Sequence, residues 1–530
     1  MMDKALEIGR RSAVGSFHLF IGVTASTLIM ALGSVILAWL MTPEEYGLYS
    51  VALIPSYTMI LFRDWGVNSA ITKFTATLRA QNRREEAYRI IRAGIIFEAI
   101  SGITLTIIAV AISSFIATEI FRRPESSTLI AIASTTIFTG ALLTASQSSF
   151  IGFERMELNS LTNILQALAK TMVSPILVLI GYSSLGAVIG YTASLSIAAI
   201  VGLTLLYLNI TRGLKGGNPG KKVLETLGEM LHYGVPFSIS SIIGGLLAQF
   251  YAFLMAIYCA DAMIGNYHVA TQFATVLTFF TTPILTVLFP AFSKIDPHGE
   301  NGLLQTVFQS AAKYTSMLLV PSTMAVMVLS KQMISTLFGE KWIHAPLFLT
   351  LYVANNLLII FGGLILGSLL AGVGETKTLM KLSLITLICG MPTAYILIPS
   401  MGILGLIITH ITAGIPSLFL GLNIIWKHYK LRVNMKESMK ILASSTTSAA
   451  ITFLTVNTIK SAYWIELAVG GTIFLATYIF AALLIGAVKK ADIENLKAIF
   501  SNIGIPSKLI NIPLNIIEEM SNILHGISPQ

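Results

Sequence analysis

Long apolar runs recur along almost the whole chain of 530 residues. Runs of 18 or more such residues are long enough to cross about 30 Å of hydrocarbon as α-helices. Only 11% of the residues are charged and 55% are hydrophobic, so no soluble enzyme domain fits between the runs. The sequence therefore predicts an all-α integral membrane protein.

The runs predict about 14 transmembrane helices. A polar, glycine-rich segment at 211–230 separates six runs from the next six, and two further runs follow. The expected helices lie near 15–41, 45–77, 88–118, 127–151, 159–181, 185–210, 235–259, 264–292, 307–336, 345–371, 380–398, 402–426, 440–459 and 463–487.

An internal repeat links the two sets of six helices. Gly47 recurs as Gly265 at an offset of 218, as do three neighbours, and Leu185-Gly186 recurs as Leu404-Gly405 at 219. We expect two parallel six-helix repeats plus two extra helices, with a cavity at the interface of the repeats. The predicted domains are 1–215 (N-terminal bundle), 216–430 (C-terminal bundle), 431–488 (two additional helices) and 489–530 (a cytoplasmic amphipathic tail).

The basic residues indicate the orientation. With the N-terminus inside, about 26 of the 34 Lys and Arg residues fall on the inner face. Three are intramembrane, and about five fall outside: Arg122, Arg123, Lys331, Lys341 and Lys460. We expect a multi-pass protein of the cell (plasma) membrane with both termini cytoplasmic and no removable signal peptide. The net charge of +9 then reflects topology and attraction to membrane lipids, and nucleic acid is not an expected partner.

The expected helix near 45–77 carries a charge pair, Arg63 and Asp64, halfway along. An ionised side chain at the bilayer centre costs roughly 3 kcal/mol, so it usually faces a water-filled path or a partner. Gly66 follows the pair, and the 218-residue offset brings Pro283 to a similar depth in the second repeat. Interruptions at matching positions indicate a transport site, with Gly66 and Pro283 as expected hinges.

Other polar residues within the spans extend this candidate substrate site. We expect Arg63, Asp64, Lys73, Lys170, Lys313 and Gln249 to contact substrate. Cations outnumber acids in this set, which favours an anion, and Arg can hold a phosphate through two parallel hydrogen bonds. Three alternatives remain open: a structural Glu98–Lys170 ion pair, snorkelling of Lys73 and Lys313, and a helix-to-helix hydrogen bond of Gln249.

Motifs for catalysis are missing from the sequence. There is no phosphate-binding glycine loop, metal-ligand spacing or nucleophile motif, and the two cysteines have no partner spacing. We therefore expect no enzyme activity, no metal and no cofactor. The last 40 residues carry apolar stripes at helical spacing, which favour two short helices on the cytoplasmic membrane surface; a partner-binding tail is the alternative.

Several motifs resemble a known family. Residues 43–49 (PEEYGLY), then Asp64-Trp65-Gly66 and Ala70, resemble the start of the polysaccharide-flippase family, and residues 372–377 (GVGETK) resemble its glycine-rich loop. That family belongs to the superfamily of multidrug, oligosaccharidyl-lipid and polysaccharide exporters, and the resemblance covers residues 1 to about 488.

The resemblance implies two six-helix bundles that rock between inward and outward states and flip a lipid-linked oligosaccharide to the outer leaflet. Similar flippases hold the carrier diphosphate in a cationic cavity, and Arg63 best fits that role. Members similar to peptidoglycan-precursor flippases carry further cavity arginines on their first and eighth helices, which this chain lacks. Expected partners are the lipid-linked oligosaccharide, membrane lipids and glycan-assembly enzymes, and a monomer is expected.

Two other functions compete with this interpretation. The first is a cation-coupled multidrug antiporter of the same superfamily. Such antiporters rely on embedded carboxylates, commonly in the first or seventh helix, and residues 15–41 and 235–259 contain no Asp or Glu. The second is a membrane scaffold that recruits envelope enzymes through its tail.

Overall fold

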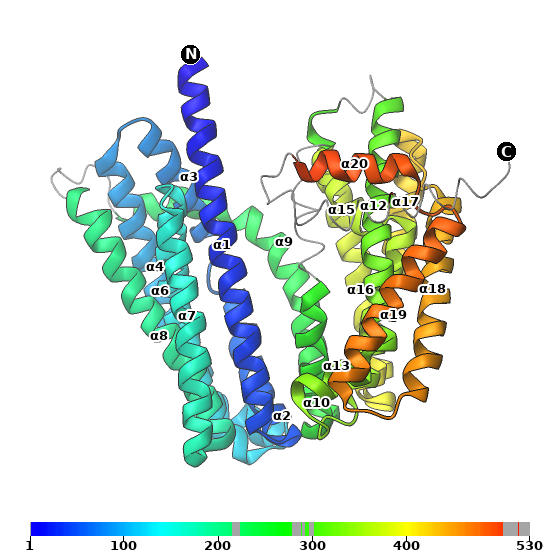
Figure 1. Ribbon diagram of the computed structural model, residues 1–530. Coiled ribbons are helices and arrows are strands. Elements are labelled where there is room, and N and C mark those ends of the chain that lie inside the picture. Colours follow the sequence, from blue (N-terminus) through cyan, green and yellow to red (C-terminus); the bar gives the residue numbers. More distant parts are fainter. Residues whose placement is uncertain are drawn as a thin grey trace. The chain divides into compact units, whose positions relative to one another are not determined.

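The computed structural model describes residues 2–214, 223–277, 288, 292–295, 301–501 and 518 (Figure 1). Every regular element within these residues is a helix, which confirms the predicted all-α class. The chain groups into two compact units. Unit 1 comprises residues 1–269 and 387–409, and unit 2 comprises residues 270–386 and 410–530.

Unit 1 is built mainly from the first half of the chain. Its elements are α1 (Met2–Leu40), α2 (Pro43–Leu61), α3 (Val67–Ala80), α4 (Arg84–Ala111), α5 (Ser113–Phe115), η1 (Ile116–Ile120), η2 (Pro124–Ser126), α6 (Ser127–Gly152), α7 (Met156–Leu177), η3 (Val178–Tyr182), α8 (Ser183–Asn209), η4 (Thr211–Leu214) and α9 (Val223–Tyr258). Helix α10 (Asp261–Ala274) begins in unit 1 and ends in unit 2.

Unit 2 contains the later helices. They are η5 (Thr275–Leu277), α12 (Asn301–Val328), α13 (Ser330–Phe338), α14 (Ala345–Ala354), η6 (Asn355–Phe361), α15 (Gly363–Gly372), α18 (Met435–Thr458), α19 (Tyr463–Leu484) and α20 (Lys490–Ser501). Helices α16 (Thr376–Met401) and α17 (Ile403–Tyr429) contribute residues to both units.

The acidic motif after α1 starts α2. The Thr42 side chain accepts a hydrogen bond from the backbone N–H of Glu45, and the Glu45 side chain accepts one from the N–H of Thr42 at 2.8 Å. This reciprocal cap satisfies two backbone donors, and Pro43 fits the first turn because its missing N–H would have no partner there. Glu45 also accepts a hydrogen bond from Ser183 at 2.6 Å, which ties α2 to the start of α8.

Three helices expected to be continuous are broken. The run near 45–77 forms α2 and α3, separated by residues 62–66. The run near 307–336 bends by 69° between α12 and α13, and the run near 345–371 bends by 55° before α15. Glycines at left-handed φ make two of these breaks, Gly66 (φ 79°) and Gly362 (φ 82°). Hydropathy reports an apolar run but not a change of its direction, so the bends of 69° and 55° were not expected, whereas the break between α2 and α3 coincides with Gly66, where an interruption was expected.

The number of spans stays open. Among the described residues, nine stretches are long and apolar enough to cross a membrane, or up to eleven if each of two bent pairs is one span. One stretch, 156–209, has 54 residues. A helix of that length would extend about 80 Å, so α7 and α8, which pack against each other, are separate crossings. The predicted total of about 14 is not confirmed, and residues 278–287 and 289–291 of the run near 264–292 lie outside the described residues.

The helix positions repeat along the chain. The pairs α2/α10, α4/α12, α6/α14, α7/α16 and α8/α17 begin at 43/261, 84/301, 127/345, 156/376 and 183/403, so their partners are 217 to 220 residues apart. This spacing agrees with the offsets of 218 and 219 found in the sequence and supports two repeats followed by α18 and α19. The domain boundaries predicted from the repeat stay a prediction.

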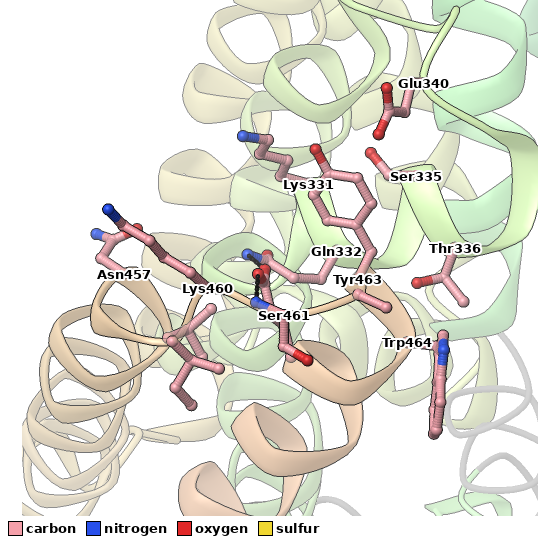
Figure 2. Close-up of a pocket in the computed structure, with 14 residues that line it drawn as sticks. Lys331, Gln332, Ser335, Thr336, Glu340, Asn457, Lys460, Ser461, Tyr463 and Trp464 are labelled. Atoms are coloured by element: carbon pink, nitrogen blue, oxygen red, sulfur yellow. Dashed lines mark hydrogen bonds between the residues drawn. The ribbon is translucent and has the colours of Figure 1, made fainter.

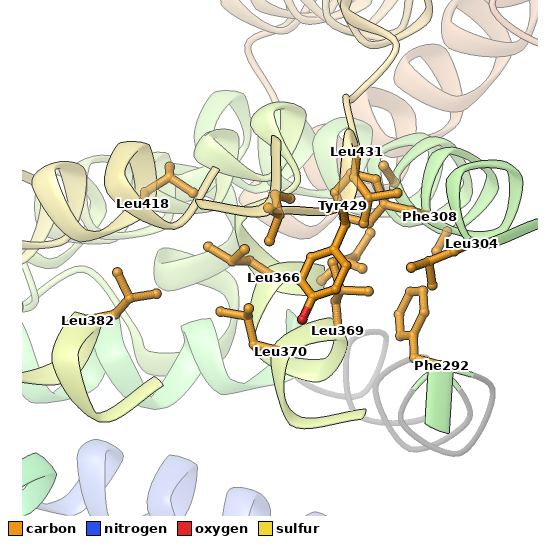
Figure 3. Packing of buried hydrophobic residues seen from close by; sticks show 14 residues of the cluster. Phe292, Leu304, Phe308, Leu366, Leu369, Leu370, Leu382, Leu418, Tyr429 and Leu431 are labelled. Carbon is orange, nitrogen blue, oxygen red and sulfur yellow. The ribbon is translucent and has the colours of Figure 1, made fainter. Parts of the chain in front are cut away.

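Unit 2 has a large apolar core (Figure 3). Residues from α12, α15, α16 and α17 meet there, with Phe308, Leu369 and Tyr429 among the buried members. Helix α20 belongs to the same unit and runs crosswise to its long helices (Figure 1). It is the first of the two short tail helices that were predicted; the second lies outside the described residues except for Glu518.

Candidate functional site

The break between α2 and α3 creates the candidate site in unit 1. Trp65 (φ 49°) and Gly66 (φ 79°) both have left-handed backbones, which is strained for a tryptophan. Gly66 packs directly on Gly234 of α9, and a Cβ built at Gly234 would lie 2.6 Å from the carbonyl carbon of Gly66. The freed carbonyl of Arg63 accepts a hydrogen bond from Ser101 of α4 at 2.7 Å. The break is therefore a packed, hydrogen-bonded feature.

The Arg63 side chain is buried and contacts residues of α4 and α6. Its Nε lies 3.1 Å from Oε2 of Glu98 on α4, and the two side chains are 5% and 0% exposed. Nη2 donates to Thr144 of α6 at 2.9 Å, and Nη1 donates to the carbonyl of Ile137 at 3.4 Å. Gly140 leaves space for this guanidinium, because a Cβ there would lie 3.3 Å from Nη1. Arg63 thus links the break that follows α2 to α4 and α6.

Two carboxylates accompany the arginine. Glu98 also accepts a hydrogen bond from the Asn68 amide at 2.9 Å. Asp64 is half-buried and accepts the backbone N–H of Asn68 at 2.8 Å, so it caps the first turn of α3. The set holds one cation and two acids. The expectation that cations outnumber acids is therefore not met around Arg63.

A cavity of about 410 Å³ is lined by Arg63 and Asp64 of this set. It is lined by residues of α2, the break, α3, α6, α7 and α9: Ile60, Leu61, Arg63, Asp64, Trp65, Asn68, Ser69, Thr144, Gln147, Ser148, Ile151, Asn159, Ser238, Ser241 and Ile242. Most polar groups are hydroxyls and amides, which can donate and accept hydrogen bonds. A site of this size and chemistry can hold a polar headgroup.

Three other predicted site residues lie in the same unit. Lys73 projects from α3, with Nζ 3.8 Å from the centre of the Tyr233 ring. Lys170 of α7 lies 4.9 Å from the centre of the Tyr191 ring on α8. Gln249 of α9 accepts a hydrogen bond from Thr58 of α2 at 3.3 Å, the helix-to-helix contact considered as its alternative. None of the three lines the cavity.

Lys313 belongs to unit 2 and has acidic partners there. Its Nζ lies 2.6 Å from Asp492 of α20 and 3.5 Å from Glu437 of α18. Lys489 also contacts Glu437, at 2.9 Å, and this ion pair raises the pKa of Lys489. Lys313 is therefore paired rather than snorkelling in the described structure. Pro283, the second expected hinge, lies outside the described residues.

Sequence reasoning missed part of the site. It considered Lys170 as the partner of Glu98, but Glu98 pairs with Arg63. It also passed over Asn68 and Thr144, which bind this pair. Polar residues within apolar runs were the available signal, but only the packing of α3, α4 and α6 shows which of them meet.

Comparisons with known proteins agree with this architecture. The model of the family described as "Polysaccharide biosynthesis protein" matches residues 12–296, and the model "Lipid II flippase MurJ" matches residues 220–480. The chain is 24% identical over 330 residues to the lipopolysaccharide biosynthesis protein WzxC of Escherichia coli K12, covering 60% of this chain and 62% of WzxC. It is 21% identical over 173 residues to the probable low-salt glycan biosynthesis flippase Agl15 of Haloferax volcanii, covering 32% and 36%. The chain thus spans less than two thirds of the length of either relative.

Solved structures share the fold. The lipid II flippase MurJ in an inward closed conformation superposes with a TM-score of 0.69 at 14% identity, covering 88% of this chain and 98% of MurJ. An inward-facing multidrug resistance transporter of the MATE family superposes with a TM-score of 0.60 at 16% identity, covering 78% and 99%. The first family model covers more than half of the chain. The chain therefore belongs to the polysaccharide biosynthesis protein family, a flippase family of the multidrug, oligosaccharidyl-lipid and polysaccharide exporter superfamily.

Proposed function

We propose that this protein flips a lipid-linked oligosaccharide from the cytoplasmic to the outer leaflet by alternating access, for assembly of a cell-surface polysaccharide or glycan. Its family and the names of WzxC, Agl15 and MurJ support a flippase of this type. The same relatives support transport rather than catalysis. The cell membrane is the expected location, and the excess of basic residues in the inner loops favours cytoplasmic termini.

The observation that carries the proposal is Arg63 in a polar cavity at a broken membrane helix. Its guanidinium can donate two parallel hydrogen bonds to a phosphate, which a lysine cannot match. We assign Arg63 as the anchor for the diphosphate of the carrier lipid, with the hydroxyls and amides of the cavity available to the first sugars.

Glu98 and a phosphate would compete for Arg63. In the described structure Glu98 holds the arginine at 3.1 Å, and Asn68 and Thr144 fix the pair. A diphosphate that enters the cavity would exchange with Glu98 for the guanidinium, leaving Glu98 hydrogen-bonded to Asn68. Asp64 would remain nearby as a second acid, so we expect a proton or a metal cation to enter with the substrate and offset its charge.

The break itself would supply the movement. Gly66 tolerates left-handed backbone angles that other residues adopt only with strain, so φ and ψ can change there without a Cβ clash. We propose that α2 and α3 change direction at Gly66 as the cavity opens and closes. Pro283 is proposed as the matching hinge of the second repeat.

The test is flipping of a fluorescent lipid-diphosphate oligosaccharide in proteoliposomes. Wild type is compared with Arg63→Ala, Arg63→Lys and Glu98→Gln, each checked for folding by thermal unfolding. Arg79 on α3 provides a matched control, because its ion pair with Glu154 is partly exposed. We expect wild type and Arg79→Ala to flip the lipid, while both Arg63 variants fail.

Glu98→Gln separates two roles of Arg63. If Arg63 binds phosphate, the glutamine variant keeps or increases substrate affinity because the competing charge is gone. If Arg63 only holds α4 in place, Glu98→Gln and Arg63→Ala should lose flipping to the same extent. That result would contradict the proposal that Arg63 binds the diphosphate of the carrier lipid.

A cation-coupled multidrug antiporter is the second candidate. The described structure brings two carboxylates, Asp64 and Glu98, to one embedded site, although neither lies on the helices where such antiporters commonly carry them. The fold similarity to a MATE transporter is consistent with this candidate. Proton- or sodium-driven movement of a small organic cation, without flipping of the lipid-linked glycan, would favour it. If Glu98→Gln lost that activity while Arg63→Ala kept it, Glu98 would be the residue that couples movement of the organic cation to the proton or sodium ion.

A truncation that tests the scaffold hypothesis must keep the contact between Lys313 and Asp492. Removing residues 491–530 would delete Asp492 and leave Lys313 without that partner. Ending the chain after Ser501 instead retains α20, which makes this contact. We expect that truncated protein to flip lipid at the wild-type rate, whereas a protein that acts by recruiting enzymes through its tail should lose function in cells.

A further inference from the structure

A second cavity, of about 700 Å³, lies at one end of unit 2 (Figure 2). It is formed where α13 and the turn after it meet the turn between α18 and α19. Its lining residues are Lys331, Gln332, Ser335, Thr336, Glu340, Val456, Asn457, Ile459, Lys460, Ser461, Ala462, Tyr463, Trp464 and Glu466. Ligand sites of small molecules have volumes in this range.

Two buried polar side chains meet at this cavity. Gln332 and Glu466 are 7% and 9% exposed, and the Gln332 amide donates to Glu466 Oε2 at 3.2 Å. The backbone N–H of Ser461 donates to the other oxygen of Glu466 at 3.4 Å. This arrangement fixes the orientation of the Gln332 amide, because the opposite orientation would place the amide oxygen against the Glu466 carboxylate.

Two acceptors at the cavity have no protein partner. Gln332 Oε1 and Thr336 Oγ1 are buried and make no hydrogen bond in the described structure. They lie one helical turn apart, on the face of α13 that lines the cavity. A buried polar group without a partner is destabilising, so a ligand that binds both would recover that loss.

The charges around the cavity balance. Lys331 and Lys460 supply two cations, and Glu340 and Glu466 supply two carboxylates. Lysine only donates and an ionised carboxylate only accepts, while the serine, threonine and amide groups do both. A cavity without net charge favours neither an anion nor a cation. It fits a neutral ligand with many donors and acceptors.

Two aromatic rings complete the site. Trp464 is 64% exposed at the start of α19, and Tyr463 has Lys331 Nζ 5.7 Å from its ring centre. An aromatic belt at the membrane surface would account for an exposed Trp464. It would not account for the buried amide and carboxylate, nor for the unpartnered oxygens. Aromatic faces beside polar groups suit a ligand that has both an apolar face and hydroxyl groups.

We infer that this cavity binds a neutral saccharide, with Gln332, Thr336 and Glu466 binding hydroxyls and Trp464 packing on a sugar ring. The inference rests on the proposed function, since a flippase for glycans meets such sugars. Lys313 and Glu437 mark the other end of α18, whose 24 residues separate the two ends by about 36 Å. With the tail cytoplasmic, the cavity would face outward, where the exported glycan emerges.

Binding of lipid-free sugars to the full chain in lipid nanodiscs tests the inference, because maltoside detergents carry sugars themselves. The probes are neutral oligosaccharides of glucose, galactose, mannose and N-acetylglucosamine, with glycerol and inorganic phosphate as controls, followed by calorimetry and saturation-transfer NMR. We expect saturable binding of at least one neutral oligosaccharide and none of glycerol. Binding of phosphate in place of sugars, or of no probe at all, would overturn the inference.

Variants locate the binding. Gln332→Leu should weaken it by roughly 3- to 10-fold, as expected for one hydrogen bond, and Trp464→Ala by roughly tenfold, with partial recovery in Trp464→Phe. Trp39→Ala is the matched control, because Trp39 is 59% exposed and belongs to unit 1. Equal affinities in all variants would place the sugar elsewhere.

The flipping assay keeps the two proposals separate. Sugar binding that weakens in Gln332→Leu and Trp464→Ala, in a protein that moves no lipid-linked glycan, would support this cavity and reject the proposed transport. Flipping of the lipid-linked glycan by a protein that binds none of the sugars would support the proposed transport and reject the saccharide site.

Discussion

Gly47 and Gly265 pack reciprocally where α2 and α10 cross. A Cβ built at Gly47 would lie 3.0 Å from Cα of Asp261, and one at Gly265 would lie 3.0 Å from the carbonyl carbon of Pro43 and 3.1 Å from the N atom of Gly47. The repeat offset relates Pro43 to Asp261 as it relates Gly47 to Gly265. Gly47 thus contacts Asp261, and Gly265 contacts Pro43, which is the residue that the offset relates to Asp261. The two contacts are therefore equivalent, as at a two-fold axis.

The first prediction concerns this crossing. Gly47→Ala and Gly265→Ala should each lower the free energy of unfolding by about 1–3 kcal/mol, because the added methyl group meets backbone that cannot move aside. Gly244→Ala on α9 is the control, since a Cβ there has no atom within 4 Å. Thermal unfolding in micelles measures the effect. Wild-type stability of both alanine variants would contradict the close approach.

The crossing shows what the sequence could predict. The paired glycines and the buried Val51 and Val269 were visible as a repeat, because both copies keep the same packing. The bends before α13 and α15 were not visible in the sequence. Leu329 and Gly362 mark these bends, but the hydropathy of the surrounding runs stays high. The periodicity of a sequence reports buried faces well, but the direction of a helix after a break depends on contacts with distant residues.

The second prediction concerns the buried pair of Arg63 and Glu98. Removing one member, as in Glu98→Leu, should cost about 3–5 kcal/mol because a buried charge loses its partner. The double variant Arg63→Met/Glu98→Leu should be more stable than either single variant, since no charge is left unpaired. A double-mutant cycle of unfolding free energies measures the coupling. Additive effects would mean that the two side chains do not interact.

This pair also marks the limit of sequence reasoning about the site. Arg63 and Asp64 were recognised because charge is rare in an apolar run. Glu98 was noticed too, but the only partner considered for it was Lys170, since Arg63 and Lys170 are both cations within apolar runs. Only the packing of α4 against α3 and α6 shows that Glu98 meets Arg63 rather than Lys170.

The third prediction concerns the anchor of α20. Asp492→Asn should release α20 from α12, because the Lys313–Asp492 contact of 2.6 Å is largely shielded from water. A hydrogen bond between charged groups contributes about 1.5–3 kcal/mol. Faster hydrogen exchange across 490–501 reports the release, and Glu494→Gln, at an exposed position of the same helix, is the control. Equal exchange in both variants would mean that the other contacts of α20, the burial of Ile493 and the hydrogen bond from Asn495 to Tyr314, are enough to hold it.

The fourth prediction concerns pH and Glu375, in the loop before α16. Hydrogen bonds from Thr378 (2.7 Å) and Tyr429 (3.2 Å) hold the pKa of Glu375 below its usual value. The folded state thus favours the ionised form, so its stabilisation is present above the unfolded pKa of about 4.3 and is lost as pH falls through the lower folded pKa. Glu375→Gln should lower Tm slightly at neutral pH, since Glu375 is partly exposed and solvent screens its charge. The difference from wild type should vanish near pH 3; an equal difference at both pH values would rule out a charge effect.

The fifth prediction concerns Arg123, which holds the turn between α9 and α10 together. Its buried guanidinium donates to the carbonyls of Ala256 and Cys259 and lies 2.6 Å from Asp261. Arg123→Ala should therefore cost roughly 3 kcal/mol, because these acceptors lose a shared donor. Arg123→Lys should recover little, since an ammonium group cannot span three acceptors in fixed directions.

Arg122 provides the control for this experiment. It is the neighbouring residue, carries the same charge and is exposed. Arg122→Ala should leave Tm unchanged, so a loss seen only at Arg123 would come from its hydrogen bonds rather than from the positive charge of the loop. Asp261 also begins α10, the helix that crosses α2 at Gly47, so Arg123→Ala should weaken that crossing as well. Combining it with Gly47→Ala should then lower Tm by less than the sum of the two single effects, whereas additive effects would show that the turn and the crossing are independent.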